Sequence, residues 1–305
     1  MHFKYTHINL YKYFYDLVKQ VPDGCITTYG ELARALGDIR AARAVGYMLS
    51  INSDPDTIPC YKVVHTDRRV GKYALGVDEK EKRLRRDGII ISNGMIENFE
   101  GRLFSEFRTD YPLTRLQKEQ KDIAALASFE DVPVADNYAA IDVSYEGRDG
   151  YGAIAIYDSG NYTVKTFYQR VDFPYIPGYL GYRETPFIEE LSDGFDSTLI
   201  IDANGLLHPR KCGLATFAGI IMGKPTIGVA KSLLLGKPDE NGYIIYNNEK
   251  LGYMINKHCI VSPGNMIGME SSIRKIKLLG KDKYPDILKK VHDETVNFRK
   301  RRLPS

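Results

Sequence analysis

The sequence predicts a two-domain α/β protein, in which a mainly helical first domain precedes a mixed β-sheet flanked by helices. With 305 residues, the chain is too long for one small core and fits two domains of about 100–200 residues each. Residues 8–92 read as short helices separated by turn residues. From residue 113, a polar helix is followed by alternating strands and helices, which is typical of a sheet with helices packed on it.

The predicted domains occupy residues 1–92 and 113–305. Between them, hydrophobic periodicity fades over residues 93–112, a stretch that contains turn residues and is the predicted linker. At the far end, Arg299–Arg302 form a basic cluster. We interpret this cluster as a solvated terminus, because runs of like charge usually face water.

Composition indicates a globular protein outside the membrane. Hydrophobic residues make up 43% of the chain and charged residues 27%, and no apolar run approaches the ~18–20 residues of a membrane span. The first residues lack the charged-then-apolar profile of a secretory signal, and the four cysteines have no CxxC spacing. We therefore expect a cytoplasmic monomer with free thiols and no membrane partner. Because the net charge is only +3, affinity for nucleic acid has to come from local patches.

Two short helices around a tight turn follow an amphipathic helix predicted over Leu10–Val21. Thr28 is a candidate N-cap, and Glu31 three residues later would complete a capping box. The next predicted helix, Ala41–Leu49, is rich in small residues. The pair matches a helix-turn-helix, and small residues fit either close approach to a nucleic-acid groove or tight packing within the protein.

Cys60 lies after an apolar-proline step and before a β-branched run, in the segment Ile58–Val64. Taken alone, such a cysteine fits a buried structural thiol. Its wider frame resembles the O6-alkylguanine-DNA alkyltransferase family over residues 8–90, without that family's usual extra N-terminal domain. The motifs that carry the resemblance, in the family's order and spacing, are Thr27–Glu31, Ala41–Gly46, Asn52, Ile58–Val64 and Gly71–Gly76.

This resemblance implies a winged helix-turn-helix domain that takes alkyl groups from guanine O6 in DNA. Cys60 would be the nucleophile, and Arg43 would enter the base stack as the damaged base flips out. Tyr29 would polarise the base or fix a phosphate, and Asn52 would order the loop beside the cysteine. A base inside a duplex has to be extruded before a thiol can reach it. Since the thiol is consumed, this domain would act once per molecule.

The chain departs from the alkyltransferase pattern next to the nucleophile. The family has histidine where Tyr61 stands, arginine where Lys62 stands, and glutamate where Asp87 stands. Tyrosine has a pKa near 10 and is a poor base at neutral pH, so the thiolate needs another source. His65 is one candidate for that source. Two outcomes remain open: transfer to Cys60, or recognition of the alkylated base without efficient transfer, as in alkyltransferase-like proteins.

Basic residues also alternate with acidic ones on a predicted helix after this motif. Either a solvated face or a contact with phosphate fits them. The basic members are Lys80, Lys82, Arg83, Arg85 and Arg86.

The second domain is predicted to begin with a three-stranded antiparallel meander and to continue with a buried central strand, Thr198–Asp202. The expected meander strands are Ala139–Tyr145, Gly152–Tyr157 and Tyr162–Phe167. Helices are expected over Pro186–Leu191 and Leu214–Met222, with a further buried strand at Thr226–Val229.

Three carboxylates stand in or beside these apolar segments: Asp142, Glu184 and Asp202. A charge on a buried strand costs free energy unless it is paired or bound to metal. Any one of the three could instead serve as a cap or turn residue. Together they would form an all-oxygen site suited to Mg²⁺ or Mn²⁺.

The second domain resembles endonuclease V over residues 113–299. The motifs that carry this resemblance are Asp142–Tyr145, Pro174–Gly178, Arg183-Glu184, Asp202–Gly205, His208–Arg210, Thr226–Ser232 and Val261–Gly264. The resemblance implies an RNase H-like fold and cleavage of a strand one nucleotide past a deaminated purine, chiefly hypoxanthine. Ala203 is a mild departure, because the family often has glycine there.

The resemblance also assigns roles around the cut. Asp142, Glu184 and Asp202 would hold the metal, His208 would help to position metal or phosphate, and Lys231 would contact phosphate near the cut. Metal-assisted cleavage of a phosphodiester requires groups of these kinds, which hold the ion and stabilise charge on the phosphate. Lys231 could alternatively be a surface charge.

For the displaced base, Tyr175 would be the wedge that fills the gap in the stack. Gly205 and the 177–180 loop, including Gly178, would offer backbone groups to the flipped base, and His292 matches a late active-site histidine. Tyr175 could instead be a loop-packing residue, and His292 an ordinary helix residue.

The sequence thus predicts a fusion of two repair functions that act on DNA with alkylated or deaminated bases. One is irreversible alkyl transfer to Cys60, and the other is metal-dependent cleavage 3′ to bases such as hypoxanthine. An alternative nuclease substrate is RNA that contains inosine.

Overall fold

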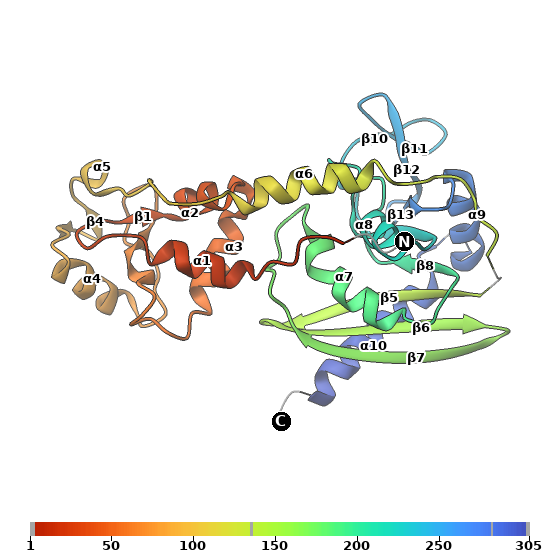
Figure 1. Cartoon of the computed structure of the whole chain (residues 1–305), viewed down its shortest axis with the longest axis horizontal. Coiled ribbons are helices and arrows are strands. Elements are labelled where there is room, and N and C mark those ends of the chain that lie inside the picture. Colours follow the sequence, from red (N-terminus) through yellow and green to blue (C-terminus); the bar gives the residue numbers. More distant parts are fainter. Residues whose placement is uncertain (1–3, 135–136, 282, 303–305) are drawn as a thin grey trace. The chain divides into compact units, whose positions relative to one another are not determined.

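The computed structural model describes residues 4–134, 137–281 and 283–302 (Figure 1). Internal contacts divide the chain into two compact units. The helical unit comprises Ile8–Leu116 together with the short segment Asp172–Pro177, and the sheet unit comprises the rest of the chain. Residues 93–112, the predicted linker, fall within the helical unit by this division.

The helical unit consists of short helices, two small strand pairs and two single 3-10 turns within its described residues. Strand β1 pairs in parallel with β2, and β3 pairs with β4 as an antiparallel hairpin. The helices are α1 (Leu10–Val18), α2 (Tyr29–Leu36), α3 (Ala42–Ser50), α4 (Val77–Arg86) and α5 (Phe99–Arg102). The strands are β1 (Thr27–Thr28), β2 (Val63–Val64), β3 (Ile91–Ser92) and β4 (Met95–Ile96), and the 3-10 turns are η1 (Ile39–Ala41) and η2 (Cys60–Lys62).

The predicted helix pair is confirmed as α2 and α3. Thr28 caps α2, because its hydroxyl accepts a hydrogen bond from the Glu31 N–H at 3.1 Å. The second half of the predicted capping box is wrong, since the Glu31 carboxylate accepts from Arg34 at 2.6 Å instead. Gly37 ends α2 with φ of +98°, a left-handed conformation that glycine adopts without a side-chain clash.

Helix α4 corrects the prediction of a purely solvated or phosphate-binding face. Lys80 is only 1% exposed and lies on the same side of the helix as buried Leu84, four residues later. Its ammonium donates to the carbonyl oxygens of Val63 at 2.6 Å and Lys72 at 3.3 Å. Burial of a lysine is tolerated here because backbone oxygens replace part of its hydration shell.

The sheet unit is built on a nine-stranded mixed sheet, counted over the described residues, with the order β10-β11-β12-β13-β9-β8-β5-β6-β7. The strands are β5 (Tyr138–Glu146), β6 (Asp149–Asp158), β7 (Asn161–Arg170), β8 (Thr198–Ile201), β9 (Thr226–Ala230), β10 (Lys237–Pro238), β11 (Tyr243–Tyr246), β12 (Glu249–Asn256) and β13 (Cys259–Asn265). The predicted meander is confirmed as β5–β6–β7, and β8 is central, running parallel to both β5 and β9.

Helices cover both faces of this sheet, as Figure 1 shows for α7 and α10. Ala139 and Ile141 of β5 pack into the same cluster as α7 and α8, whereas Ala140 packs with α9 and α10 on the opposite face. The two clusters follow the alternation of side chains along a strand. The helices of this unit are α7 (Leu180–Leu191), α8 (Leu214–Met222), α9 (Met269–Gly280) and α10 (Asp286–Arg302), with α6 (Pro112–Ala124) containing the division between the units.

Helix α7 begins earlier than predicted. It starts at Leu180 rather than Pro186, so Glu184 lies inside the helix and not before it. A proline in a helix interior removes one hydrogen bond and costs about 3 kcal/mol. Burial of Phe187 and Leu191 against the sheet offsets that cost. Among the described residues, none of the helices combines the length and the apolar character that crossing a bilayer needs.

Candidate functional sites

Cys60 opens the 3-10 turn η2 and is only 5% exposed. The side-chain N–H group of Asn52 donates to Sγ of Cys60 at 2.9 Å. The side-chain oxygen of Asn52, Oδ1, accepts from the Asp54 N–H at 3.0 Å. Burial raises the pKa of the Cys60 thiol to about 11, against the opposing effects of the Asn52 hydrogen bond and the Lys80 ammonium. At neutral pH the sulfur is therefore protonated.

Of the other residues assigned to this site, Tyr29 lies near the cysteine. It is the first residue of α2, and burial followed by the charge of Cys60 raises the pKa of its hydroxyl. The Tyr29 ring lies 5.4 Å from the ring of His65, centroid to centroid. Arg43 is an exposed residue of α3. Tyr29, Asn52 and Cys60 are thus brought together, with Arg43 on the helix that follows the turn.

Tyr61 does not take over the part of a histidine base. Its hydroxyl donates to Oδ2 of Asp87 at 2.8 Å, and burial together with the Asp87 carboxylate raises the pKa of Tyr61 to about 12. Only the phenolate form of Tyr61 could take a proton from a thiol, and the raised pKa keeps that form almost absent at neutral pH. Tyr61 therefore fastens the cysteine turn to the end of α4.

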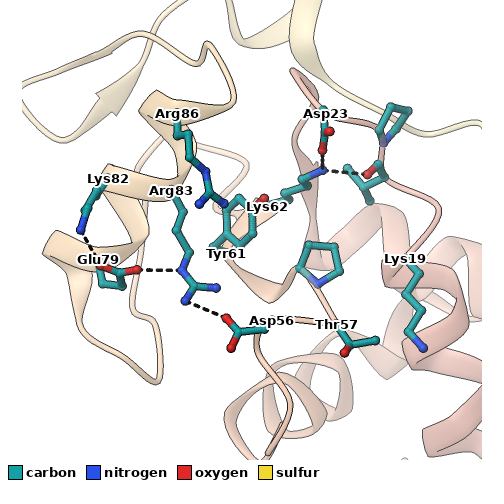
Figure 2. A pocket seen from close by; sticks show the side chains of 13 residues that line it. Lys19, Asp23, Asp56, Thr57, Tyr61, Lys62, Glu79, Lys82, Arg83 and Arg86 are labelled. Carbon is teal, nitrogen blue, oxygen red and sulfur yellow. Dashed lines mark hydrogen bonds and ion pairs between the residues drawn. The ribbon is translucent and has the colours of Figure 1, made fainter.

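A polar cleft of about 720 Å³ opens beside this turn. Figure 2 shows Arg83 between Glu79 and Asp56, and Lys62 directed at Asp23. Arg83 lies 2.8 Å from Glu79 and 3.0 Å from Asp56, and Lys62 lies 2.7 Å from Asp23. These cations already have partners, so we interpret the cleft as an ion-pair network that supports the turn.

Lys80, expected on a solvated or phosphate-binding face, is instead a buried residue near Cys60. Burial lowers the pKa of its ammonium to about 8, and the charge of Cys60 acts in the opposite direction. The two side chains are therefore within electrostatic reach of each other. The spacing to Leu84 was the available signal, because residues four apart share a helix face and Leu84 is apolar.

In the sheet unit, Asp142 and Asp202 lie side by side. Ile141 of β5 is the partner of Ile201 of β8, and each is followed by one of the two aspartates. Because β5 and β8 are parallel and in this register, both aspartates come to the same edge, Asp202 directly after the end of β8 and Asp142 inside β5. Oδ2 of Asp142 lies 2.8 Å from Nδ1 of His292 on α10, and Oδ2 of Asp202 lies 2.7 Å from Nζ of Lys231.

Glu184 approaches the same edge from α7. Burial, followed by repulsion from Asp142, raises the pKa of Glu184 to about 8, with a smaller contribution of the same sign from Asp202. Its Oε1 accepts a hydrogen bond from the Tyr145 hydroxyl at 3.1 Å. The three carboxylates therefore share one electrostatic environment.

Each of these carboxylates is nevertheless engaged by its own neighbour. Within the described parts of the chain, no three acidic, histidine or cysteine side chains converge as a ready-made metal centre. The chemistry of the set still fits a hard divalent cation, because three neighbouring carboxylates without a shared counter-ion repel one another. Burial is the main cause of the raised pKa of Glu184, and repulsion from Asp142 and Asp202 adds to it.

Two tyrosines of this site were given no role from the sequence, although Tyr145 ends the motif Asp142–Tyr145. Tyr145 donates to Glu184, and Tyr284 lies near Asp202 with Nζ of Lys231 5.0 Å from its ring centroid. Burial and the charge of Asp202 raise the pKa of Tyr284 well above its usual value, so its hydroxyl stays protonated. Tyr145 stands three residues after Asp142, a spacing that gives no signal on a strand.

His208 and Gly178 lie together in the sheet unit. His208 is 4% exposed, and its Nδ1 accepts from the N–H of Arg210 at 3.2 Å and of Cys212 at 3.4 Å. A Cβ on Gly178 would lie 3.5 Å from Nε2 of His208. Tyr175 is 60% exposed and belongs to the segment Asp172–Pro177 of the helical unit.

Gly205 lies against the backbone of β13. A Cβ there would lie 2.2 Å from the carbonyl oxygen of Pro263, and the Gly205 N–H donates to the Ser262 hydroxyl at 2.8 Å. The absence of a side chain lets the loop after Asp202 pack directly on the neighbouring strand.

Gly205→Ala is therefore expected to lower the free energy of unfolding by about 3 kcal/mol or more, because the added methyl group meets backbone that cannot rotate away. Chemical denaturation of the full chain measures this change. Gly280→Ala is the matched control in the same unit, since its methyl group would approach Pro285 no closer than 3.4 Å. Equal stability of the two variants would contradict the close packing at Gly205.

Comparison with known proteins finds a matching family for each half of the chain. A model of the endonuclease V family matches residues 118–293, and a model of the DNA-binding domain of 6-O-methylguanine DNA methyltransferase matches residues 9–89. A bifunctional methyltransferase/endonuclease of Picrophilus torridus is 57% identical over 296 residues, which cover 97% of this chain and 99% of the relative. The chain belongs to this bifunctional family, and its second part to endonuclease V.

The family relationship extends to a bifunctional methyltransferase/endonuclease of Thermoplasma volcanium, which is 45% identical over 95% of this chain and 91% of the relative. The structure of Ciona intestinalis endonuclease V in complex with a 24mer DNA containing an inosine followed by a ribo-adenosine covers 63% of this chain and 99% of that chain. With 22% identity and a TM-score of 0.56, this likeness shows a shared fold. The predicted family membership and two-domain fold are confirmed, and endonuclease V enzymes are generally metal-dependent.

Proposed function

We propose that this bifunctional methyltransferase/endonuclease transfers an alkyl group from O6-alkylguanine to Cys60 and cuts DNA 3′ to deaminated bases such as hypoxanthine. The observation that carries the nuclease half is the register of β5 and β8, which sets Asp142 beside Asp202 within electrostatic reach of Glu184. A duplex with one hypoxanthine and an otherwise identical duplex with guanine test it. Only the first is expected to be cut, and only with a divalent metal present.

Asp142, Glu184 and Asp202 are the proposed metal ligands, with Mg²⁺ or Mn²⁺ as the ion. When bound, such an ion polarises phosphoryl oxygens and lowers the pKa of a coordinated water. Lys231 contacts Asp202, and His292 contacts Asp142. Both contacts have to break before the carboxylates converge on a metal ion. Once released, the Lys231 ammonium is free to contact a phosphate near the cut, and His292 to move a proton at Nδ1.

The proposed base-recognition groups lie on loops. Tyr175 would fill the space left by the displaced base, which suits an exposed ring held between prolines that fix φ. Gly178 and Gly205 would bring backbone groups close to the flipped base. His208 would assist in positioning the metal or phosphate, which suits a buried ring whose orientation is fixed by two backbone N–H groups that donate to its Nδ1.

Alkyl transfer would proceed by attack of the Cys60 sulfur on the alkyl carbon. The S–C bond forms as the C–O6 bond breaks, and the departing guanine oxygen takes a proton. Arg43 would occupy the space of the extruded base and Tyr29 would bind the base or a phosphate. Asn52 positions the sulfur by the hydrogen bond that it donates. Removal of the thiol proton is the demanding step, because the thiolate is the nucleophile.

The rate of alkyl transfer is expected to rise with pH. Because burial raises the pKa of Cys60 to about 11, the thiolate fraction should increase about tenfold per pH unit from pH 7 to pH 10. Single-turnover reactions with O6-methylguanine duplex, followed by intact-protein mass, give this profile. Tyr61→His should raise the rate at pH 7 by about tenfold or more, since it supplies a base at the residue that follows Cys60 in the chain.

Tyr61→Phe is the control for that substitution, because it keeps the ring, loses the bond to Asp87 and supplies no base. It is expected to bring no acceleration. A wild-type rate that stays constant between pH 7 and pH 9 would contradict this account, since the thiolate would then already be formed.

The protonated Cys60 and the engaged Tyr61 also support a second candidate for the helical unit, which is recognition of alkylated bases without efficient transfer. Intact-protein mass distinguishes the two, since recognition alone leaves the mass unchanged. For the sheet unit, cleavage rates on matched DNA and RNA strands that carry inosine decide between the two nucleic acids.

A further inference from the structure

The end of α10 gathers positive charge that the proposed chemistry does not use. Lys300, Arg301 and Arg302 are exposed, and over the described residues none of the three lies in an ion pair with a carboxylate. The helix dipole stabilises cations at a helix C-terminus, and this accounts for one or two of the three. These three cations, none of them neutralised by a carboxylate of the described residues, leave positive charge at the end of a folded helix that an anionic partner would neutralise.

This charge lies on the same helix as an active-site residue. His292 contacts Asp142, the Ser144 hydroxyl donates to the Thr295 carbonyl oxygen at 3.2 Å, and Arg299 donates to the Tyr145 carbonyl oxygen at 2.8 Å. Helix α10 therefore follows β5 from the catalytic aspartate toward the end of that strand. Arg302 lies ten positions after His292, which is about 15 Å along a helix. That length spans about four phosphates of one DNA strand.

The end of β7 extends the charged surface. The Arg302 guanidinium lies 4.6 Å from the ring centroid of Tyr168, which is 37% exposed, and Arg170 ends the strand as an exposed residue. We call Tyr168, Arg170, Lys300, Arg301 and Arg302 the basic edge. Two carboxylates oppose it: Asp149, which is the register partner of Arg170 and accepts from the Tyr168 hydroxyl, and Glu146, which is the register partner of Asp149.

We propose that the basic edge binds the phosphate backbone of the nucleic-acid strand being cut, on the side of the active site where α10 ends. The inference rests on the proposed nuclease function and names a contact for its substrate. Charge complementarity selects a polyanion, and a tyrosine ring among cations is typical of surfaces that hold nucleic-acid strands. Because the basic edge and His292 share helix α10, we expect the bound polyanion to be the strand that the nuclease cuts.

The test compares Arg301→Gln/Arg302→Gln with wild type in single-turnover cleavage of a hypoxanthine duplex over a range of protein and salt concentrations. Loss of two phosphate contacts should raise the half-saturating protein concentration about tenfold at 0.1 M salt. It should also flatten the log–log salt dependence by about 1.5, with the saturated rate unchanged. The charge-retaining variant Arg301→Lys/Arg302→Lys should recover most of the affinity.

Lys257→Gln is the matched control, since Lys257 is an exposed cation of the same unit on the turn between β12 and β13. Thermal unfolding of each variant checks that α10 stays packed. A double variant with the half-saturation and salt slope of Lys257→Gln overturns the proposal while the nuclease function stands. A fall in the saturated rate alone also overturns it, because α10 would then act only by supporting His292.

Failure of the nuclease proposal would look different. Wild-type protein would not cut the hypoxanthine duplex at all, whatever the state of the basic edge. Fluorescence anisotropy with the same duplex still reports the affinity and salt slope of each variant in that case. The two outcomes are therefore separable in one set of proteins.

Discussion

Asp142→Asn is expected to lower the rate of strand cleavage by at least about 1,000-fold, because it removes one negative ligand from the proposed metal site, whose chemistry depends on charge. Asparagine keeps the shape of the side chain, so β5 and its pairing with β8 should persist. The loss of one charge also relieves the repulsion that raises the pKa of Glu184. The folded variant should be at least as stable as wild type when no metal is present.

Cleavage of a hypoxanthine duplex and its binding by anisotropy are the two measurements for this variant. Binding is expected to change little, since neutralising a carboxylate does not remove a contact to DNA. Asp158→Asn is the control, as Asp158 is an exposed aspartate of the same sheet unit at the end of β6. Cleavage that survives in Asp142→Asn would remove Asp142 from the active site.

Cys60→Ala is expected to abolish alkyl transfer completely. Wild-type protein incubated with O6-methylguanine duplex should gain the mass of one methyl group in place of one proton, and peptide mapping should place it on Cys60. The other thiols serve as internal controls. Burial raises the pKa of Cys212 to about 12 and of Cys259 to about 11, and neither has the Asn52 hydrogen bond that Cys60 has.

The variant also separates recognition from transfer. Cys60→Ala should still bind the alkylated duplex, because Tyr29, Arg43 and Asn52 remain in place. No mass gain in wild type after long incubation at pH 9, where the thiolate is more abundant, would leave the helical unit as a recognition module. A methyl group found on Cys25 or another cysteine would contradict the assignment of Cys60.

The sequence was most informative where burial and periodicity act together. The meander β5–β6–β7 follows from alternating residues, and β8 follows from a short run that is apolar on both faces. Asp142 and Asp202 were visible as carboxylates in or beside these strands. Parallel pairing of β5 and β8 then brings them to one edge, which no local pattern along the chain encodes.

The partners of individual side chains were harder to predict from the sequence, because they depend on tertiary contacts. The pairing of Asp202 with Lys231 joins residues 29 positions apart, and the pairing of Asp142 with His292 joins residues 150 positions apart. Lys80 read as a surface charge because lysine is rarely buried, yet backbone oxygens near η2 receive its ammonium. Pro186 suggested a helix start, and packing of α7 on the sheet overrode that local preference.

The most direct test of two separate activities in one chain uses two oligonucleotides in one tube, one with hypoxanthine and one with O6-methylguanine, with strand cleavage and protein mass read together. Wild type should cut the first and become methylated by the second. Asp142→Asn should lose only the cleavage, and Cys60→Ala only the methylation. Loss of both activities in either folded variant would contradict the account.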